Sequence, residues 1–522
     1  MSKKSFIGGT IILMAAGFIV RILGFVYRIY LSNLIGAEGM GLFQLIMPVY
    51  SLIILTLTSG ISIAVSKMVA SEMAKKHNAN LIRITACALI ISAAAGAVIS
   101  GLIFINVRFI ADFILKDGRT YHSLMLLVPC IPVIAAAAAI KGYFYGTREV
   151  MPTAVSQVAE QVVKIGLVVV LAAYFVNIGL EYACALATIG MALGEICNLA
   201  VLYFVYHFKK KKLTANCAKS GIMRKRDIIK NLLVISLPIS FNRFIASAMS
   251  ALEVILIPRR LIAGGLDYQS SISEYGRLTG MAMPLIFFPS LVTSSLATTI
   301  VPAISEAISL KQYKSVNYRI SKSIQLTFIL GFIFTVIFMA YPKEIGEMVY
   351  RKEDIGEILY FLSFSCTFTY LQQTLLGILN GLGKQAVSLR NSIIGNSIRI
   401  CFVYFFIPIY GIKGYTAGII ISSALVCSLN IYSIIRTTGM AVDIRNWIVK
   451  PGMVAAVMVF ISKYIYGFFM IFNAGHTWTV FMSICGNAAV SAALMVAAGA
   501  LDRDEVFKVF VKMPANAIRK KR

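Results

Sequence analysis

Long runs of apolar residues, separated by short polar segments, follow one another along this chain almost from its first residue to residue 500. A helix of about 20 apolar residues crosses the ~30 Å hydrocarbon layer of a membrane. We therefore expect fourteen membrane-spanning helices, near residues 6–30, 42–66, 84–105, 122–145, 153–175, 182–207, 229–256, 276–302, 323–341, 357–380, 389–408, 414–435, 448–470 and 478–500. The pattern predicts an all-α integral membrane protein.

The distribution of lysine and arginine predicts the orientation of the chain. Because fourteen is an even number, both termini lie on the same side of the membrane. With the N-terminus in the cytoplasm, the cytoplasmic segments hold 33 lysines and arginines and the external loops hold 9, when bases near the cytoplasmic end of a span are counted with the adjoining segment. Basic loops stay in the cytoplasm. We expect both termini to be cytoplasmic, the protein to lie in the cytoplasmic membrane, and the first run to be retained as a span.

The two halves of the chain align when Lys164 is laid on Arg399. Without a gap, the segment 142–146 then falls on 377–381. Six predicted spans separate the repeats, and an even number gives both the same orientation, as in parallel-repeat transporters. We expect two like-oriented six-helix bundles around a central cleft. The predicted parts are an N-terminal bundle (1–208), a basic cytoplasmic linker (209–228), a C-terminal bundle (229–436), and two additional helices with a basic cytoplasmic tail (437–522).

Composition narrows the function classes. The net charge of +27 could indicate a nucleic-acid partner, but the bases cluster between apolar runs, as in a membrane protein. The nine cysteines form no CxxC and no Cys/His ligand spacing, so we expect small buried side chains and no metal site. HExxH, Walker A and GxSxG motifs are absent from the sequence. We therefore expect neither an enzyme nor a cofactor, and no nucleic-acid partner.

Charged side chains inside the apolar runs are the main clue to function. A charge in hydrocarbon costs roughly 2.5–3.5 kcal/mol or more, so such a side chain usually faces a bundle interior or a water-filled cavity. Seven bases and three acids stand out: Arg21, Arg28, Lys164, Arg243, Arg277, Arg399 and Lys463, against Glu160, Glu195 and Glu253. This surplus of positive charge predicts a cavity that receives an anion.

Arg21 and Arg28 are the leading pair on one helix. They are seven residues apart and so share one helical face, with Gly17 and Gly24 close by. The glycines leave room for a backbone to approach, and a guanidinium binds phosphate bidentately while staying ionised. For Arg21 the alternative is an ion pair with one of the three acids. Arg28 lies nearer the external end, where snorkelling is the alternative.

The other bases fall at varied depths. Arg277 opens the eighth span on the external side, and Arg243 lies deep in the seventh, with Glu253 a possible neighbour. Lys164 and Arg399 lie at the middle of spans five and eleven, and all four are candidate substrate contacts. Lys463 lies in the additional helices, where we expect it to snorkel.

The acids leave a second hypothesis open. Glu253, Glu195 and Glu160 could form a cation or proton site of the kind that an antiporter needs. The first span contains no Asp or Glu, which weakens the hypothesis of a cation-coupled antiporter for drugs or other small molecules.

The chain resembles a known family. The 6 + 6 + 2 pattern is similar to the multidrug/oligosaccharidyl-lipid/polysaccharide superfamily. Arg21-Ile-Leu-Gly-Phe25 resembles a stretch of bacterial lipid II flippases, and Leu34–Phe43 resembles the polysaccharide-exporter branch. Arg277-Leu278 resembles a second cavity arginine of the flippases. The chain departs from them in its second span, since residues 42–66 carry no charge.

The resemblance implies a flippase. It implies that Arg21 and Arg277 contact a pyrophosphate, and that the cargo is an undecaprenyl-pyrophosphate-linked saccharide, a peptidoglycan precursor used for spore cortex. The expected partners are this lipid-linked anionic saccharide and membrane lipids, and cell-wall synthesis proteins are further candidates. The rival hypotheses are the antiporter and a non-transporting membrane scaffold for envelope assembly. In the scaffold, the cytoplasmic loop 208–230 would matter and the cavity charges would not.

Overall fold

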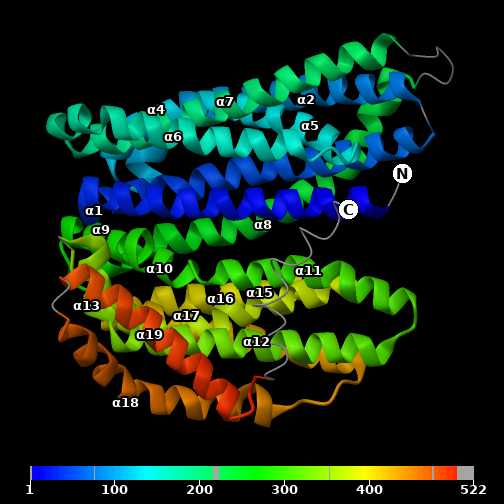
Figure 1. The fold of residues 1–522 in the computed structure, drawn as a ribbon. Coiled ribbons are helices and arrows are strands. Elements are labelled where there is room, and N and C mark those ends of the chain that lie inside the picture. The colour runs from blue at the N-terminus through cyan, green and yellow to red at the C-terminus, as the bar shows by residue number, and fades with distance from the viewer. Residues whose placement is uncertain (1–2, 76, 216–222, 352, 473–474, 502–522) are drawn as a thin grey trace. The chain divides into compact units, whose positions relative to one another are not determined.

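Helices make up the regular structure of this chain. The computed structural model describes residues 3–75, 77–215, 223–351, 353–472 and 475–501. No strand occurs among these residues (Figure 1). The chain divides into two compact units, Met1–Met281 and Ala282–Arg522. The prediction of an all-α membrane protein is confirmed. The predicted bundle boundaries stay a prediction, and most of the basic tail lies outside the described residues.

In the described part of the first unit, nine α-helices and several short helical turns follow one another. They are α1 (Lys3–Ala74), α2 (Asn78–Ile105), α3 (Val107–Phe109), η1 (Ile110–Leu115), η2 (Gly118–Thr120), α4 (Tyr121–Leu127), η3 (Val128–Cys130), α5 (Ile131–Gly146), α6 (Met151–Ile178), α7 (Leu180–Ala215), α8 (Lys225–Ala263) and α9 (Tyr268–Gly276). The turn η4 (Arg277–Ala282) ends this unit and begins the next.

The helix α1 joins the first two predicted spans through a kink. Gly36 has φ 68° and ψ −174°, a conformation open to glycine and strained for other residues. The next residues are packed away: Ala37 and Met40 are buried. Because the segment after the kink is buried against its unit, it stays helical and does not form a loop. The predicted spans 6–30 and 42–66 lie on either side of this kink.

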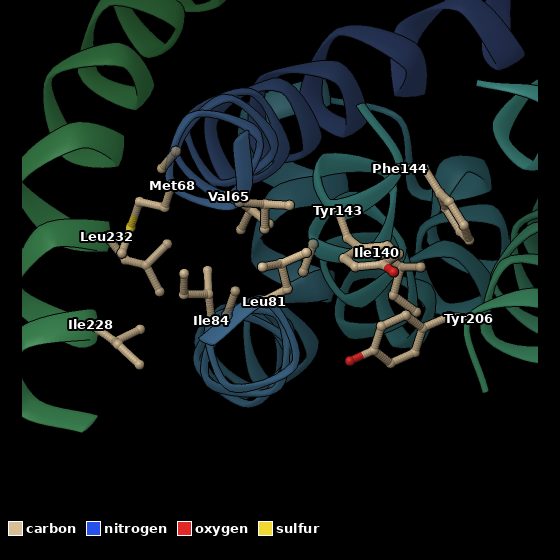
Figure 2. Close-up of a cluster of buried hydrophobic side chains, with 14 of the residues drawn as sticks. Val65, Met68, Leu81, Ile84, Ile140, Tyr143, Phe144, Tyr206, Ile228 and Leu232 are labelled. Carbon is tan, nitrogen blue, oxygen red and sulfur yellow. The ribbon is translucent and has the colours of Figure 1, made fainter. Parts of the chain in front are cut away.

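A buried apolar cluster holds the first unit together. Its side chains come from α1, α2, α5, α7 and α8 and are buried, and Figure 2 labels several of them. They include Val65 and Met68 of α1, Leu81 and Ile84 of α2, Ile140, Tyr143 and Phe144 of α5, Tyr206 of α7, and Ile228 and Leu232 of α8. In this cluster α8 packs with α1 and α2. The residues of α8 therefore belong to the core of the first unit, with α1 as a neighbour.

The second unit contains the remaining helices. They are α10 (Met283–Phe287), α11 (Ser290–Ser309), α12 (Tyr313–Ala340), α13 (Pro342–Tyr350), α14 (Gly356–Ser363), α15 (Cys366–Gly381), α16 (Gln385–Tyr410), α17 (Ile412–Thr438), η5 (Arg445–Val449), α18 (Lys450–Met470) and α19 (His476–Ala497). A second apolar cluster, with Leu375 and Trp447 among its members, is buried between α11, α12, α15, α17 and η5.

Twelve helical stretches among the described residues are long and apolar enough to cross a membrane. The difference from fourteen has two sources. One is α1, in which two helices meet at the kink at Gly36 and count as a single stretch. The other is the predicted span 357–380, which is divided between α14 and α15. All fourteen predicted ranges fall mainly on helical segments, and the number of fourteen crossings stays a prediction.

The predicted repeat is visible in the helix bounds. The alignment that lays Lys164 on Arg399 also lays both ends of α2 on those of α12, and both ends of α5 on those of α15. Close contacts repeat as well. A Cβ added at Gly142 would lie 2.7 Å from the carbonyl oxygen of Ser62, and one at Gly377 would lie 2.6 Å from that of Ala297. Since Ser62 falls on Ala297 in the same alignment, the backbone supports the internal repeat. The orientation of the two bundles relative to each other stays a prediction.

Candidate functional site

The cationic face of α1 is present and open. The helix runs without interruption from Arg21 to Arg28, so both guanidinium groups lie on the predicted face. Arg21 is exposed and Arg28 is half-buried. A Cβ added at Gly17 or Gly24 would meet no atom within 4 Å from another part of the described chain. No backbone of the described chain therefore packs against these two glycines.

Lys164 of α6 lies beside this helix. Its Nζ is 4.8 Å from the centre of the Tyr27 ring, within the range of a cation–π contact. Tyr27 immediately precedes Arg28. The Arg28 guanidinium is close enough to Lys164 for the two charges to interact electrostatically. Two of the predicted cations, from helices far apart in sequence, are thus neighbours in the first unit.

Two of the predicted acids form a pair on α6 and α7. The Nδ2 of Asn198 donates to Oε2 of Glu160 at 2.9 Å and to Oε2 of Glu195 at 3.3 Å. These helices pack closely, because a Cβ added at Gly194 would lie 3.0 Å from the carbonyl oxygen of Glu160. The buried amide of Asn198 therefore bridges two carboxylates inside the helix bundle.

Glu160 and Glu195 form one cluster with Lys141 and Lys164. The charges of Glu195, Lys141 and Lys164 all act on Glu160. Lys141 was missed by the sequence analysis, although it lies within the predicted span 122–145. A charge count over every residue of each span would have found it. Asn198 was also missed, because a neutral amide in a span gives no comparable signal.

Arg277 has an acidic partner. Its Nη1 lies 3.0 Å from Oε1 of Glu274, one turn earlier, and both side chains are about one-third exposed at 33% and 32%. The helix α9 that leads to it is capped by Asp267, whose side chain accepts a hydrogen bond from the backbone N–H of Ser270. Hydrogen bonds from Ser270 lower the pKa of Asp267. Arg277 is thus positioned by a capped helix and shares its charge with Glu274.

The other predicted residues lie at separate places. Glu253 of α8 is buried. Glu253 and Arg28 both lie close enough to Tyr275 to interact with it electrostatically. Arg243 is exposed on α8, and Lys463 is exposed on α18. Arg399 belongs to the second unit. Its Nη2 donates to Oδ1 of Asn396 at 3.1 Å, and it lines a cavity of about 200 Å³. The structure therefore groups Arg28, Lys164, Glu160 and Glu195 within the first unit, while Arg399 belongs to the second unit.

The sequence of this chain matches the models of two known protein families. Residues 6–308 match the sequence model of the family described as "Polysaccharide biosynthesis protein", and residues 277–405 match that of the MatE family. The first match covers more than half of the chain. The chain belongs to the polysaccharide biosynthesis protein family. It is a multi-pass membrane protein of the multidrug/oligosaccharidyl-lipid/polysaccharide superfamily of transporters, as the resemblance implied.

Two curated relatives match most of the length of this chain. Stage V sporulation protein B of Bacillus subtilis (strain 168) is 29% identical over 511 residues, which is 98% of each chain. Lipid II flippase MurJ of the same organism is 25% identical over 432 residues, or 77% of each chain. The curated relatives therefore include a sporulation protein and a lipid flippase.

Solved structures of other transporters share the fold of this chain. A lipid II flippase MurJ in an inward closed conformation has a TM-score of 0.68 at 13% identity, covering 93% of this chain and 99% of that one. An inward-facing multidrug resistance MATE family transporter has a TM-score of 0.63 at 15% identity, covering 81% and 98%. At these identities the likeness concerns the fold.

Proposed function

We propose that this chain is a flippase for an anionic lipid-linked saccharide. The cargo is an undecaprenyl-pyrophosphate-linked peptidoglycan precursor of the kind used for spore cortex. The headgroup crosses from the cytoplasmic to the external leaflet by alternating access, while the polyprenyl tail stays in lipid. In this proposal both termini lie in the cytoplasm, as the bias of lysine and arginine toward the predicted cytoplasmic segments indicates.

The observation that carries this proposal is the open cationic face of α1 beside Lys164. Moving a pyrophosphate away from water is expensive unless other groups replace its hydration. Arg21 and Arg28 offer forked N–H donors on one face, and Gly17 and Gly24 leave room next to them. Lys164 adds a third cation close to Arg28. Several contacts of moderate strength would hold the headgroup and still let it leave.

The relatives support the class of cargo. One is named a lipid II flippase, one is named a sporulation protein, and the matching family is named for polysaccharide biosynthesis. Each name applies to the relative, and its transfer to this chain is part of our proposal.

Glu160 and Glu195 suit a coupling role. Two carboxylates that share one amide donor repel each other unless a proton or cation lies between them. Lys164 interacts electrostatically with both acids and with Arg28. We propose that protonation of this pair changes how strongly Lys164 and Arg28 hold the anion. The same pair supports the antiporter as a second candidate function.

Single substitutions separate the candidates. Arg21→Ala, Arg277→Ala, Glu195→Ala and Glu253→Ala are each tested for complementation of a strain that lacks the protein, with expression checked. Lys463→Ala, at an exposed position of α18, is the matched control. Loss of function with both arginine variants supports the flippase. Loss with an acid variant while Arg21→Ala remains active supports the antiporter. Retention in all four supports the scaffold.

A further inference from the structure

The second unit contains a polar cavity that the proposed transport route does not use. It has a volume of about 200 Å³ and lies between α15, α16 and α17. Eleven residues line it: one charged side chain, Arg399, seven neutral polar side chains, and three apolar or small residues. The cavity thus has one positive charge and no acid in its lining. This composition favours an anion over a cation as its ligand.

The hydrogen bond between Arg399 and Asn396 fixes the orientation of one lining amide. A guanidinium has N–H donors and no acceptor, so only the amide oxygen of Asn396 can face it. The distance from Nη2 of Arg399 to that Oδ1 is 3.1 Å. The oxygen of Asn396 therefore faces the guanidinium, and its NH2 group supplies N–H donors.

A second chain of hydrogen bonds reaches the cavity from Arg390. Its Nε and Nη2 each lie 3.3 Å from Oδ1 of Asn391. The Nδ2 of Asn391 then donates to Oδ1 of Asn430 at 2.8 Å. Asn391 and Asn430 are both buried, and Asn430 lines the cavity. Since its oxygen is used by Asn391, Asn430 also offers N–H donors. Hydrogen bonds in such a chain polarise one another, and here both chains begin at a cation.

Corresponding positions of the first unit carry acids, whereas the cavity of the second unit has none in its lining. In the alignment that lays Lys164 on Arg399, Asn396 corresponds to Gln161. Asn430 corresponds to Glu195, and Gly395 corresponds to Glu160. The second unit thus has uncharged residues at the positions that correspond to Glu160 and Glu195.

We propose that the cavity lined by Arg399, Asn396 and Asn430 binds an oxyanion, a phosphate or a carboxylate. The donors of the two asparagines and the guanidinium converge on the bound oxygen atoms. The ligand is either a free anion or the anionic headgroup of a lipid. This inference stands on the second unit alone and remains valid if the proposed transport activity is wrong.

Calorimetric titration of the purified full-length protein with inorganic pyrophosphate, against sodium chloride of equal ionic strength, tests the site. Every sample carries Arg21→Ala and Arg28→Ala, so that the α1 cations do not contribute. Arg399→Gln and Asn430→Asp are the test variants, and Lys463→Gln is the control. We expect the control to bind pyrophosphate, and both test variants to bind at least about tenfold more weakly, which is about 1.4 kcal/mol. Arg399→Lys should recover part of the affinity.

Unchanged affinity in both test variants overturns the proposal, as does the absence of pyrophosphate binding in the control. Thermal midpoints and size-exclusion profiles check that each variant is folded. If Asn430→Asp fails to fold, Ser392→Asp replaces it, because Ser392 lines the same cavity at an exposed position. Farnesyl pyrophosphate identifies the source of the ligand. Tighter binding than inorganic pyrophosphate supports a site for a lipid headgroup, and equal binding supports a site for a free anion.

Discussion

At the scale of single residues, Lys164 and Arg399 occupy corresponding positions of the repeat among different neighbours. Lys164 lies near Glu160 and Glu195, whereas Arg399 contacts Asn396 and lines a cavity without acids. The sequence identified both bases because a charge in an apolar run is conspicuous. Asn391, Asn430 and similar neutral residues were missed, since an amide acquires a role only from the groups that orient it.

Arg21 should matter through the geometry of its side chain as well as its charge. Because a guanidinium forms two parallel hydrogen bonds with a phosphate, Arg21→Lys should retain only part of the activity and Arg21→Ala should lose more. A hydrogen bond to a charged group contributes about 1.5–3 kcal/mol, so the alanine variant should transport roughly ten- to a hundredfold more slowly. The measurement is the rate of headgroup transfer in proteoliposomes. Equal rates for all three proteins would exclude Arg21 as a cargo contact.

Glu195 should link transport to protons. In Glu195→Gln the pair with Glu160 loses one negative charge, and the amide keeps nearly the same shape. We expect transport by the wild-type protein to respond to an imposed pH gradient and transport by this variant to respond less. The rates are compared with and without the gradient, and Glu357→Gln, at an exposed position of α14, is the control. A full response in Glu195→Gln would contradict the coupling role.

At the scale of helices, the apolar runs predicted the positions of the spans well. Every predicted range falls mainly on helical segments because a run of about 20 apolar residues satisfies its backbone internally in lipid. The kink at Gly36, where the helix of the first predicted span meets that of the second, was not predicted. It depends on one backbone conformation and on the burial of the residues that follow, and apolar periodicity reports neither.

Gly36 is the residue on which the kink depends. A side chain at φ 68° and ψ −174° is strained, so Gly36→Ala should lower the free energy of unfolding by about 1–3 kcal/mol. Gly24→Ala is the matched control on the same helix, since a Cβ there meets nothing within 4 Å. Thermal unfolding in detergent gives the comparison. Equal midpoints for the two variants would show that the kink tolerates a side chain.

The glycines at corresponding contacts of the repeat should respond alike. Gly142→Ala and Gly377→Ala each place a methyl group less than 3 Å from a carbonyl oxygen of a neighbouring helix. Overpacking of this kind costs about 1–3 kcal/mol. Gly166→Ala, with open space around it, should be neutral or slightly stabilising. Thermal midpoints check all three. A loss in only one of the repeat-related variants would show that the two contacts are not equivalent.

At the scale of the whole molecule, the long apolar runs were enough to predict the fold class, and the resemblance of Arg21–Phe25 and Leu34–Phe43 to known transporters indicated the family. The structures of a lipid II flippase and of a MATE transporter share the fold, and the repeat recurs in the helix bounds. The partners of the charged side chains in the candidate sites were harder to predict. Pairing of Glu160 with Glu195 through Asn198, and of Arg277 with Glu274, depends on which helices pack and which turns face each other.

Leaflet-resolved labelling in proteoliposomes tests the central claim most directly. Vesicles containing a polyprenyl-pyrophosphate saccharide in the inner leaflet are prepared with the purified wild-type protein, with Arg21→Ala, or without protein, and an impermeant reagent labels the headgroups that reach the outer leaflet. We predict rapid labelling with the wild-type protein, and slow labelling with Arg21→Ala and in empty vesicles. Labelling at the same slow rate in all three would contradict the flippase account.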